Sequence, residues 1–173
     1  MARVEAHQLS KSYGKHTVFK DLSFTAASSV VGIAGRNGAG KSTLLKCIAG
    51  LLKPTAGKVS WVNSKDNEIA LEQLKKRLGF AAPYISLYEE LTVTENLTFL
   101  FDVRNEKDRG QIDEVLHRTG ANPFKNSLFG SLSTGQQQRA RIAAAIVHQP
   151  EILFLDEPGS NLDAKGRAIV DGL

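Results

Sequence analysis

The alternation of apolar and polar residues predicts strands near both ends of the chain. VEAHQL (4–9) and HTVFKDLSFTA (16–26) are short and partly alternating, and GKVSWVN (57–63) predicts a third strand. The runs Val30 to Ala34 and Ile152 to Asp156 are almost wholly apolar. Such runs are typical of strands buried on both faces of a parallel sheet.

Helical spacing dominates the middle of the chain, from about residue 64 to 132. Apolar residues recur at helical intervals in three segments, EIALEQLKKR (68–77), TENLTFLFDV (94–103) and GQIDEVLHRT (110–119). Thr94 is a candidate cap for the second segment, and Pro123 interrupts the region. Two further helices are predicted from Lys41 to about Leu51, ending near Lys53 and Pro54, and from Thr134 to His148. This order of elements predicts an α/β domain with a helical subdomain.

The amino-acid composition excludes few classes of function. The 173 residues carry a net charge of +4, which suits a protein that handles phosphates without demanding nucleic acid as a partner. The single cysteine, Cys47, excludes an internal disulfide and predicts a buried side chain in a reducing compartment. No apolar run has the length of a signal peptide or a membrane helix, so we expect a soluble chain that would reach a membrane only through a partner.

A glycine-rich phosphate loop, GRNGAGKS (35–42), lies between a predicted strand and a predicted helix. It matches the P-loop pattern at every fixed position, and its glycines let the backbone bend closely around phosphate oxygens. Lys41 is predicted to contact the β- and γ-phosphates, and the Ser42 hydroxyl is a candidate Mg²⁺ ligand. The residues predicted to bind nucleotide here are Gly35, Asn37, Gly38, Ala39, Gly40, Lys41, Ser42 and Thr43.

Two acidic residues, Asp156 and Glu157, form an acidic strand end after the apolar run at 152–155. A carboxylate at the tip of a buried strand beside a P-loop can hold Mg²⁺ through its water shell, and Asp156 has that position. Glu157, one residue further, is the candidate general base for the attacking water. By itself this pattern also fits a surface turn after a strand. The presence of the phosphate loop in the same chain favours the catalytic interpretation.

A third motif, LSTGQQQR (132–139), opens the last long predicted helix and makes a second possible anion site. With this motif the chain resembles the ABC ATPase family, whose signature has the form L-S-G-G-Q-x-x-R. Thr134 replaces the usual glycine, whereas Ser133, Gly135 and Gln136 match. A P-loop kinase would have no use for this signature.

The resemblance covers essentially the whole chain and implies an α/β fold with a P-loop NTPase core sheet, an N-terminal antiparallel β subdomain and a helical insert subdomain. It implies a single nucleotide-binding domain over residues 1–173. The core would span about 1–80 and 149–173, and the insert with the signature helix about 81–148. ATP and Mg²⁺ are the implied cofactors.

The resemblance also implies a head-to-tail dimer of two such subunits. In it, Ser133, Thr134, Gly135 and Gln136 would contact the nucleotide held by the other subunit. Tyr13 lies where the family places an aromatic residue that stacks on adenine, although a plain strand-end tyrosine is the alternative reading. Ser160 and Asp163 fall in the family's D-loop, which touches the partner.

Two positions depart from the family pattern. The family's glutamine that contacts Mg²⁺ and the attacking water is missing, and Pro83 or Tyr84 takes its place. The switch histidine is also missing, because all four histidines precede Glu157 and the sequence ends at Leu173. We therefore expect a C-terminally truncated domain that binds ATP far better than it hydrolyses it.

The leading hypothesis is the ATP-hydrolysing subunit of an ABC membrane transporter, peripheral on the cytoplasmic face of the cell membrane. It would work with separate membrane-spanning subunits and without nucleic acid. The alternative is a soluble ABC ATPase with a regulatory or mechanical role. The tandem cassettes or long coiled-coil inserts usual in such proteins do not occur here. The transported substrate is not encoded in these motifs.

Overall fold

The N-terminal residues form a three-stranded antiparallel sheet, as the alternation predicts. In this computed structural model, which describes residues 2–27, 29–104, 110–160, 162 and 164–172, the strand order is β2-β1-β3. Strand β1 covers Arg3–Tyr13, β2 covers His16–Ala26 and β3 covers Ala56–Val62. The central strand, β1, pairs with both neighbours, and Val4 lies opposite Ala26 on one side and Trp61 on the other.

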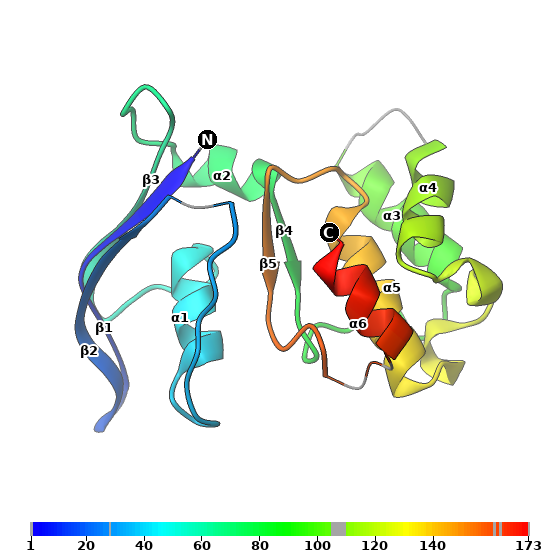
Figure 1. The fold of residues 1–173 in the computed structure, drawn as a ribbon, viewed down its shortest axis with the longest axis horizontal. Helices are drawn as coiled ribbons and strands as arrows, with labels where there is room; N and C mark the ends of the chain where they lie inside the picture. Colours follow the sequence, from blue (N-terminus) through cyan, green and yellow to red (C-terminus); the bar gives the residue numbers. More distant parts are fainter. Residues whose placement is uncertain (1, 28, 105–109, 161, 163, 173) are drawn as a thin grey trace. The chain divides into compact units, whose positions relative to one another are not determined.

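Two helices belong to the same part of the chain, α1 (Lys41–Ile48) and α2 (Leu71–Arg77). The apolar face of α1 packs on the sheet, where Cys47 is buried against Leu9 and Ala6 (Figure 1). The Trp61 indole of β3 donates a hydrogen bond of 2.9 Å to the Ile48 carbonyl at the end of α1. These contacts confirm the prediction that Cys47 is a core residue.

The predicted strand from Val30 to Ala34 is not formed, and this part of the prediction is wrong. The segment has no regular secondary structure, and the side chains of Val30 and Val31 are 83% and 56% exposed. A strand needs a neighbour for its backbone N–H and C=O groups, and no strand of the described residues pairs with this segment. Apolar character alone therefore does not make it a strand.

Residues from Arg77 onward form a second compact unit, distinct from the first unit, Met1–Lys76. Its two strands are parallel, β4 (Leu78–Ala81) and β5 (Ile152–Leu155), with Leu78 opposite Ile152 and Ala81 opposite Leu155. The helices are α3 (Val93–Val103), α4 (Gly110–Arg118), α5 (Thr134–Ile146) and α6 (Ala164–Asp171). Short 3₁₀ turns cover Asn122–Phe124 and Phe129–Ser131.

Helix α5 connects the helical part of the second unit with its strands (Figure 1). On one side, Ala140 and Ala143 join a core made with α3 and α4 that includes Leu97 and Phe101. On another side, Ile142 and Ala145 pack against Ala81 of β4 in a second cluster. The helix that begins with the signature is thus packed directly against the strand that precedes Pro83 and Tyr84. The first unit ends at residue 76, and the second unit contains both the helices and β5, which was predicted to belong with residues 1–80. The division of the domain into core and insert stays a prediction.

The predicted helices are confirmed, but one predicted cap is wrong. Helix α3 is capped by Thr92, whose hydroxyl accepts a hydrogen bond from the Glu95 amide while the Glu95 carboxylate accepts one from the Thr92 amide. Thr94 lies inside the helix, and its hydroxyl donates to the Lys125 carbonyl. The spacing T-x-x-E is the capping-box signal that favours Thr92. None of the helices in the described ranges is long and apolar enough to cross a membrane.

Candidate functional site

The phosphate loop, residues 35–42, adopts a conformation that its glycines permit. Gly38 and Gly40 have φ angles of 79° and 89°, in the left-handed region that favours glycine. A Cβ atom at Gly40 would also collide with the side chain of Val18 on β2. Gly40 is the N-cap residue of α1, so the loop leads directly into the positive end of that helix.

The side chain of Lys41 turns back over the loop. Its ammonium group donates to the carbonyls of Gly35 and Arg36, at 2.9 and 3.0 Å. Leu44 is the first α1 residue to make the helical hydrogen bond, to the Gly40 carbonyl at 2.8 Å, so the preceding amides face the loop. Ser42 and Thr43 lie in this first turn. The amides at a helix N-terminus and an ammonium group beside them suit a bound phosphate chain.

Tyr13 lies at the end of β1 in the same unit and is exposed. The ammonium group of Lys11 is 5.0 Å from the centre of its ring, a cation–π distance. An exposed aromatic face beside a positive charge is compatible with stacking on a base. The stacking of Tyr13 on adenine stays a prediction.

The acidic strand end lies in the second unit, at the tip of β5. Asp156 is buried, with 5% exposure, and its amide donates to the Ala81 carbonyl of β4 at 2.9 Å. Its carboxylate atom Oδ2 is also buried, and none of the described residues makes a hydrogen bond to it. A buried carboxylate oxygen with no partner is costly, so it suits a ligand position.

Tyr84 is a neighbour of Asp156 that the motifs do not reveal. Burial and the negative charge of the nearby Asp156 carboxylate raise the pKa of Tyr84. The motifs indicate only that Pro83 or Tyr84 replaces the family's glutamine, because the nearness of this turn to Asp156 depends on the pairing of β4 with β5.

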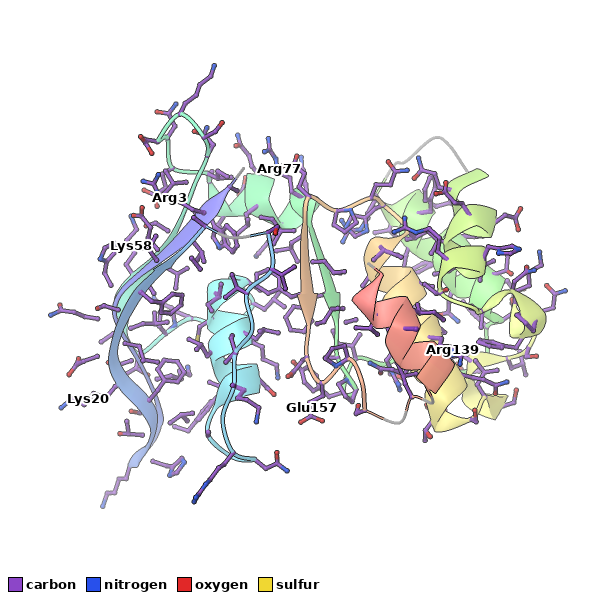
Figure 2. All side chains as sticks on the ribbon, in the orientation of Figure 1. Arg3, Lys20, Lys58, Arg77, Arg139 and Glu157 are labelled. Carbon is purple, nitrogen blue, oxygen red and sulfur yellow. The ribbon has the colours of Figure 1, made fainter. Side chains whose placement is uncertain are left out.

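Glu157 follows Asp156 at the end of β5 and is exposed (Figure 2). Its φ angle is 48°, an uncommon conformation for a residue other than glycine, and such strain is concentrated at functional sites. Its carbonyl accepts a hydrogen bond from the Ser160 amide at 3.0 Å, which turns the chain back. Ser160 thus lies in the same turn, whereas Asp163 lies outside the described residues.

The signature, residues 132–139, begins helix α5 with a capping box. The Ser133 hydroxyl accepts from the Gln136 amide at 3.4 Å, and the Gln136 side-chain oxygen accepts from the Ser133 amide at 3.0 Å. The spacing S-x-x-Q is the signal that predicts this box. An open pocket of about 550 Å³ adjoins the helix end, and its lining includes Ser133, Thr134, Gly135, Gln136 and Arg139. The contact of this pocket with a partner's nucleotide stays a prediction.

The described residues contain no group of three or more His, Cys, Asp or Glu side chains that could coordinate a metal ion by themselves. Mg²⁺ does not require one, because it commonly binds one or two protein oxygens together with phosphates and water. The unpartnered Oδ2 atom of Asp156 and the Ser42 hydroxyl fit that mode. Ser42 belongs to the first unit and Asp156 to the second, and their joint binding of a metal stays a prediction.

Comparison with known proteins identifies the family. The family model described as ABC transporter matches residues 19–160, which include the phosphate loop, the signature and the acidic strand end. The chain therefore belongs to the ABC transporter family, and its fold is that of an ABC ATPase domain.

Individual relatives agree with this assignment. The chain is 35% identical to the sulfate/thiosulfate import ATP-binding protein CysA of Synechococcus elongatus, over 95% of this chain and 48% of that protein. It is 36% identical to the bacitracin transport ATP-binding protein BcrA of Enterococcus faecalis, over 94% of this chain and 53% of that protein.

Among solved structures, cbiO1 of Clostridium perfringens, part of the ABC transporter complex cbiONQ, superposes with a TM-score of 0.73 at 28% identity. The match covers 96% of this chain and 70% of that one. The chain spans about half the length of the two curated relatives.

Proposed function

We propose that this chain is the ATP-binding and ATP-hydrolysing subunit of an ABC membrane transporter. The observation that carries the proposal is the phosphate loop, in which Lys41 and the N-terminus of α1 converge on the same turn. Similarity to an import ATP-binding protein and to a transport ATP-binding protein supports the coupling to transport.

Some residues of the proposed site bind the nucleotide, and others take part in its hydrolysis. Lys41 and the amides of the first turn of α1 bind the phosphates, and Tyr13 stacks on the base. When bound, Mg²⁺ neutralises charge that develops on the transferred phosphoryl group, and Ser42 and Asp156 are its protein ligands. Glu157 polarises the attacking water and accepts its proton.

Coupling to transport would depend on two kinds of partner. A second copy of the subunit would contribute Ser133 and Gly135 of its signature to each nucleotide, so that ATP joins the two subunits and hydrolysis releases them. Membrane-spanning subunits would carry the substrate, and this chain would bind them on the cytoplasmic face of the membrane. Copurification of this chain with a polytopic membrane protein tests that assembly, and copurification with soluble partners alone would contradict it.

ATP binding with and without Lys41 tests the nucleotide site directly. Charge-assisted hydrogen bonds contribute about 1.5–3 kcal/mol, so Lys41→Ala should weaken ATP binding at least about tenfold in calorimetry. Lys20, an exposed residue of β2 in the same unit, provides a matched loss of charge (Figure 2). Lys20→Ala should leave the affinity within about twofold. Equal affinity of the Lys41→Ala variant and the native chain would rule out the nucleotide site.

A further inference from the structure

The end of β1, which carries Lys11 and Tyr13, lies one strand away from the phosphate loop. Within the first unit, a Cβ atom at Gly40 would collide with Val18 and would lie 3.6 Å from the Phe19 ring, so the loop lies against β2. Strand β1 pairs with β2 and places Lys11 opposite Phe19. The sheet thus brings these two side chains close to the loop that is proposed to bind the phosphates.

The ammonium group of Lys11 lies over the ring of Tyr13 and is fixed by the backbone. It is 5.0 Å from the centre of the ring, and it donates a hydrogen bond of 2.9 Å to the Lys53 carbonyl. Lys11 is half-buried, whereas Tyr13 is 54% exposed. One face of the ring is therefore covered by a positive charge, while much of the ring stays accessible to a ligand.

The backbone between the two residues is anchored to both neighbouring segments. The Ser12 amide donates to the Thr55 hydroxyl at 3.0 Å, and that hydroxyl donates back to the Ser12 carbonyl at 3.3 Å. On the other side, the Ser12 hydroxyl hydrogen-bonds the Thr17 hydroxyl of β2 at 3.1 Å. The strand end is thus ordered before a ligand binds, which lowers the entropic cost of stacking on Tyr13.

A cation over one face of an aromatic ring changes how the other face stacks. The faces of aromatic rings carry partial negative charge, so two stacked faces repel each other electrostatically. A cation on the far side attracts that charge and weakens the repulsion. The ammonium group of Lys11 also occupies one face of Tyr13, so that a base has a single face on which to stack.

We propose that Lys11 is a positioning residue for the base of the nucleotide: its ammonium group covers one face of Tyr13 and strengthens the stacking of the base on the other face. This inference rests on the proposed function, in which Tyr13 stacks on the base. It adds a residue that acts through Tyr13 and contacts neither the base nor the phosphates, because its ammonium group is bonded to the Lys53 carbonyl.

The test measures how much the nucleoside adds to binding. Calorimetry in one Mg²⁺ buffer gives the affinities for ATP and for inorganic tripolyphosphate, and their ratio is the nucleoside contribution. Tyr13→Leu removes the ring and should lower the nucleoside contribution about tenfold. Lys11→Met keeps the length of the side chain but removes the charge, and it should lower the nucleoside contribution about two- to fivefold. Its affinity for tripolyphosphate should stay within about twofold of the native value.

Further variants separate the contact with the ring from a general loss of charge or packing. Lys11→Arg keeps a cation over the ring and should restore at least about half of the nucleoside contribution. Lys11→Met should have no further effect once Tyr13→Leu has removed the ring, because the two residues act as a pair. Lys20→Met is the matched control on an exposed residue of β2, and it should leave the nucleoside contribution unchanged. Thermal melting checks that every variant is folded.

The outcomes separate this inference from the proposed function. The role of Lys11 is overturned if Lys11→Met leaves the nucleoside contribution unchanged, or if it weakens ATP and tripolyphosphate equally. An equal effect of Lys11→Met with and without the Tyr13 ring would also overturn it. If Tyr13→Leu leaves the nucleoside contribution unchanged, stacking on Tyr13 fails and the role of Lys11 fails with it, whereas the phosphate site is decided separately by Lys41→Ala.

Discussion

Two apolar runs precede the two motifs that define the candidate site, and they behave differently. Ile152–Leu155 forms β5, pairs with β4 along its whole length, and ends at the buried carboxylate of Asp156. Val30 to Ala34 has a similar apolar character but forms no strand, and its two valines are exposed. Nevertheless the phosphate loop that follows it has left-handed glycines and a lysine bonded to the loop backbone.

The difference shows which part of the site depends on tertiary contacts. The phosphate loop is held by hydrogen bonds between residues five or six positions apart, and it needs no paired strand before it. The acidic strand end is held by β4, because the Asp156 amide donates a hydrogen bond to the Ala81 carbonyl. We infer that binding of phosphate is a local property of the sequence, whereas placement of the metal ligand is not.

The largest expected effect separates these two parts by function. Glu157→Gln keeps the size of the side chain and removes the base, so ATP turnover should fall by about 10²–10³-fold while ATP affinity changes little. Steady-state phosphate release and a binding titration measure the two quantities. Glu151→Gln is the control, since Glu151 precedes β5 and forms an exposed ion pair with Arg77 at 3.3 Å. Native turnover in Glu157→Gln would show that Glu157 is not the base.

A core substitution tests whether the run that pairs, β5, stabilises the fold more than the unpaired run at residues 30–34. Phe154 of β5 is buried and stacks on Phe80 of β4 with ring centres 6.0 Å apart. Phe154→Ala should lower the free energy of unfolding by about 3 kcal/mol, because it leaves a cavity. Val31→Ala should change it by less than about 0.5 kcal/mol, as expected for an exposed residue. Urea denaturation of both variants decides the point, and equal losses would contradict the contrast between the runs.

The smallest expected effect tests the local construction of the phosphate loop. Gly40→Ala places a side chain at a φ angle of 89° and against Val18, which should cost about 1–2 kcal/mol of stability and weaken ATP binding. Gly32→Ala is the matched substitution, because a Cβ atom there meets nothing within 4 Å. It should be neutral in both measurements. Thermal melting and an ATP titration of both variants measure the two effects. Equal stability and equal ATP affinity of Gly40→Ala and Gly32→Ala would contradict the prediction.

Most helices and the antiparallel sheet follow from local patterns in this chain. Alternation predicts β1, β2 and β3, and helical spacing predicts α3, α4 and α5, because each element buries one face and the period of that face is visible in the sequence. The capping boxes at Thr92 and Ser133 are equally local, because the spacings T-x-x-E and S-x-x-Q predict them.

The sequence by itself determined the phosphate loop, the order of the three motifs and membership of the ABC transporter family, since these depend on neighbouring residues. Only the tertiary structure decided that Val30 to Ala34 is not a strand and that Asp156 lies beside Ala81 of β4. Both facts depend on which strands pair. The backbone groups of a strand are satisfied by residues distant in the sequence, and the apolar character of a run does not specify them.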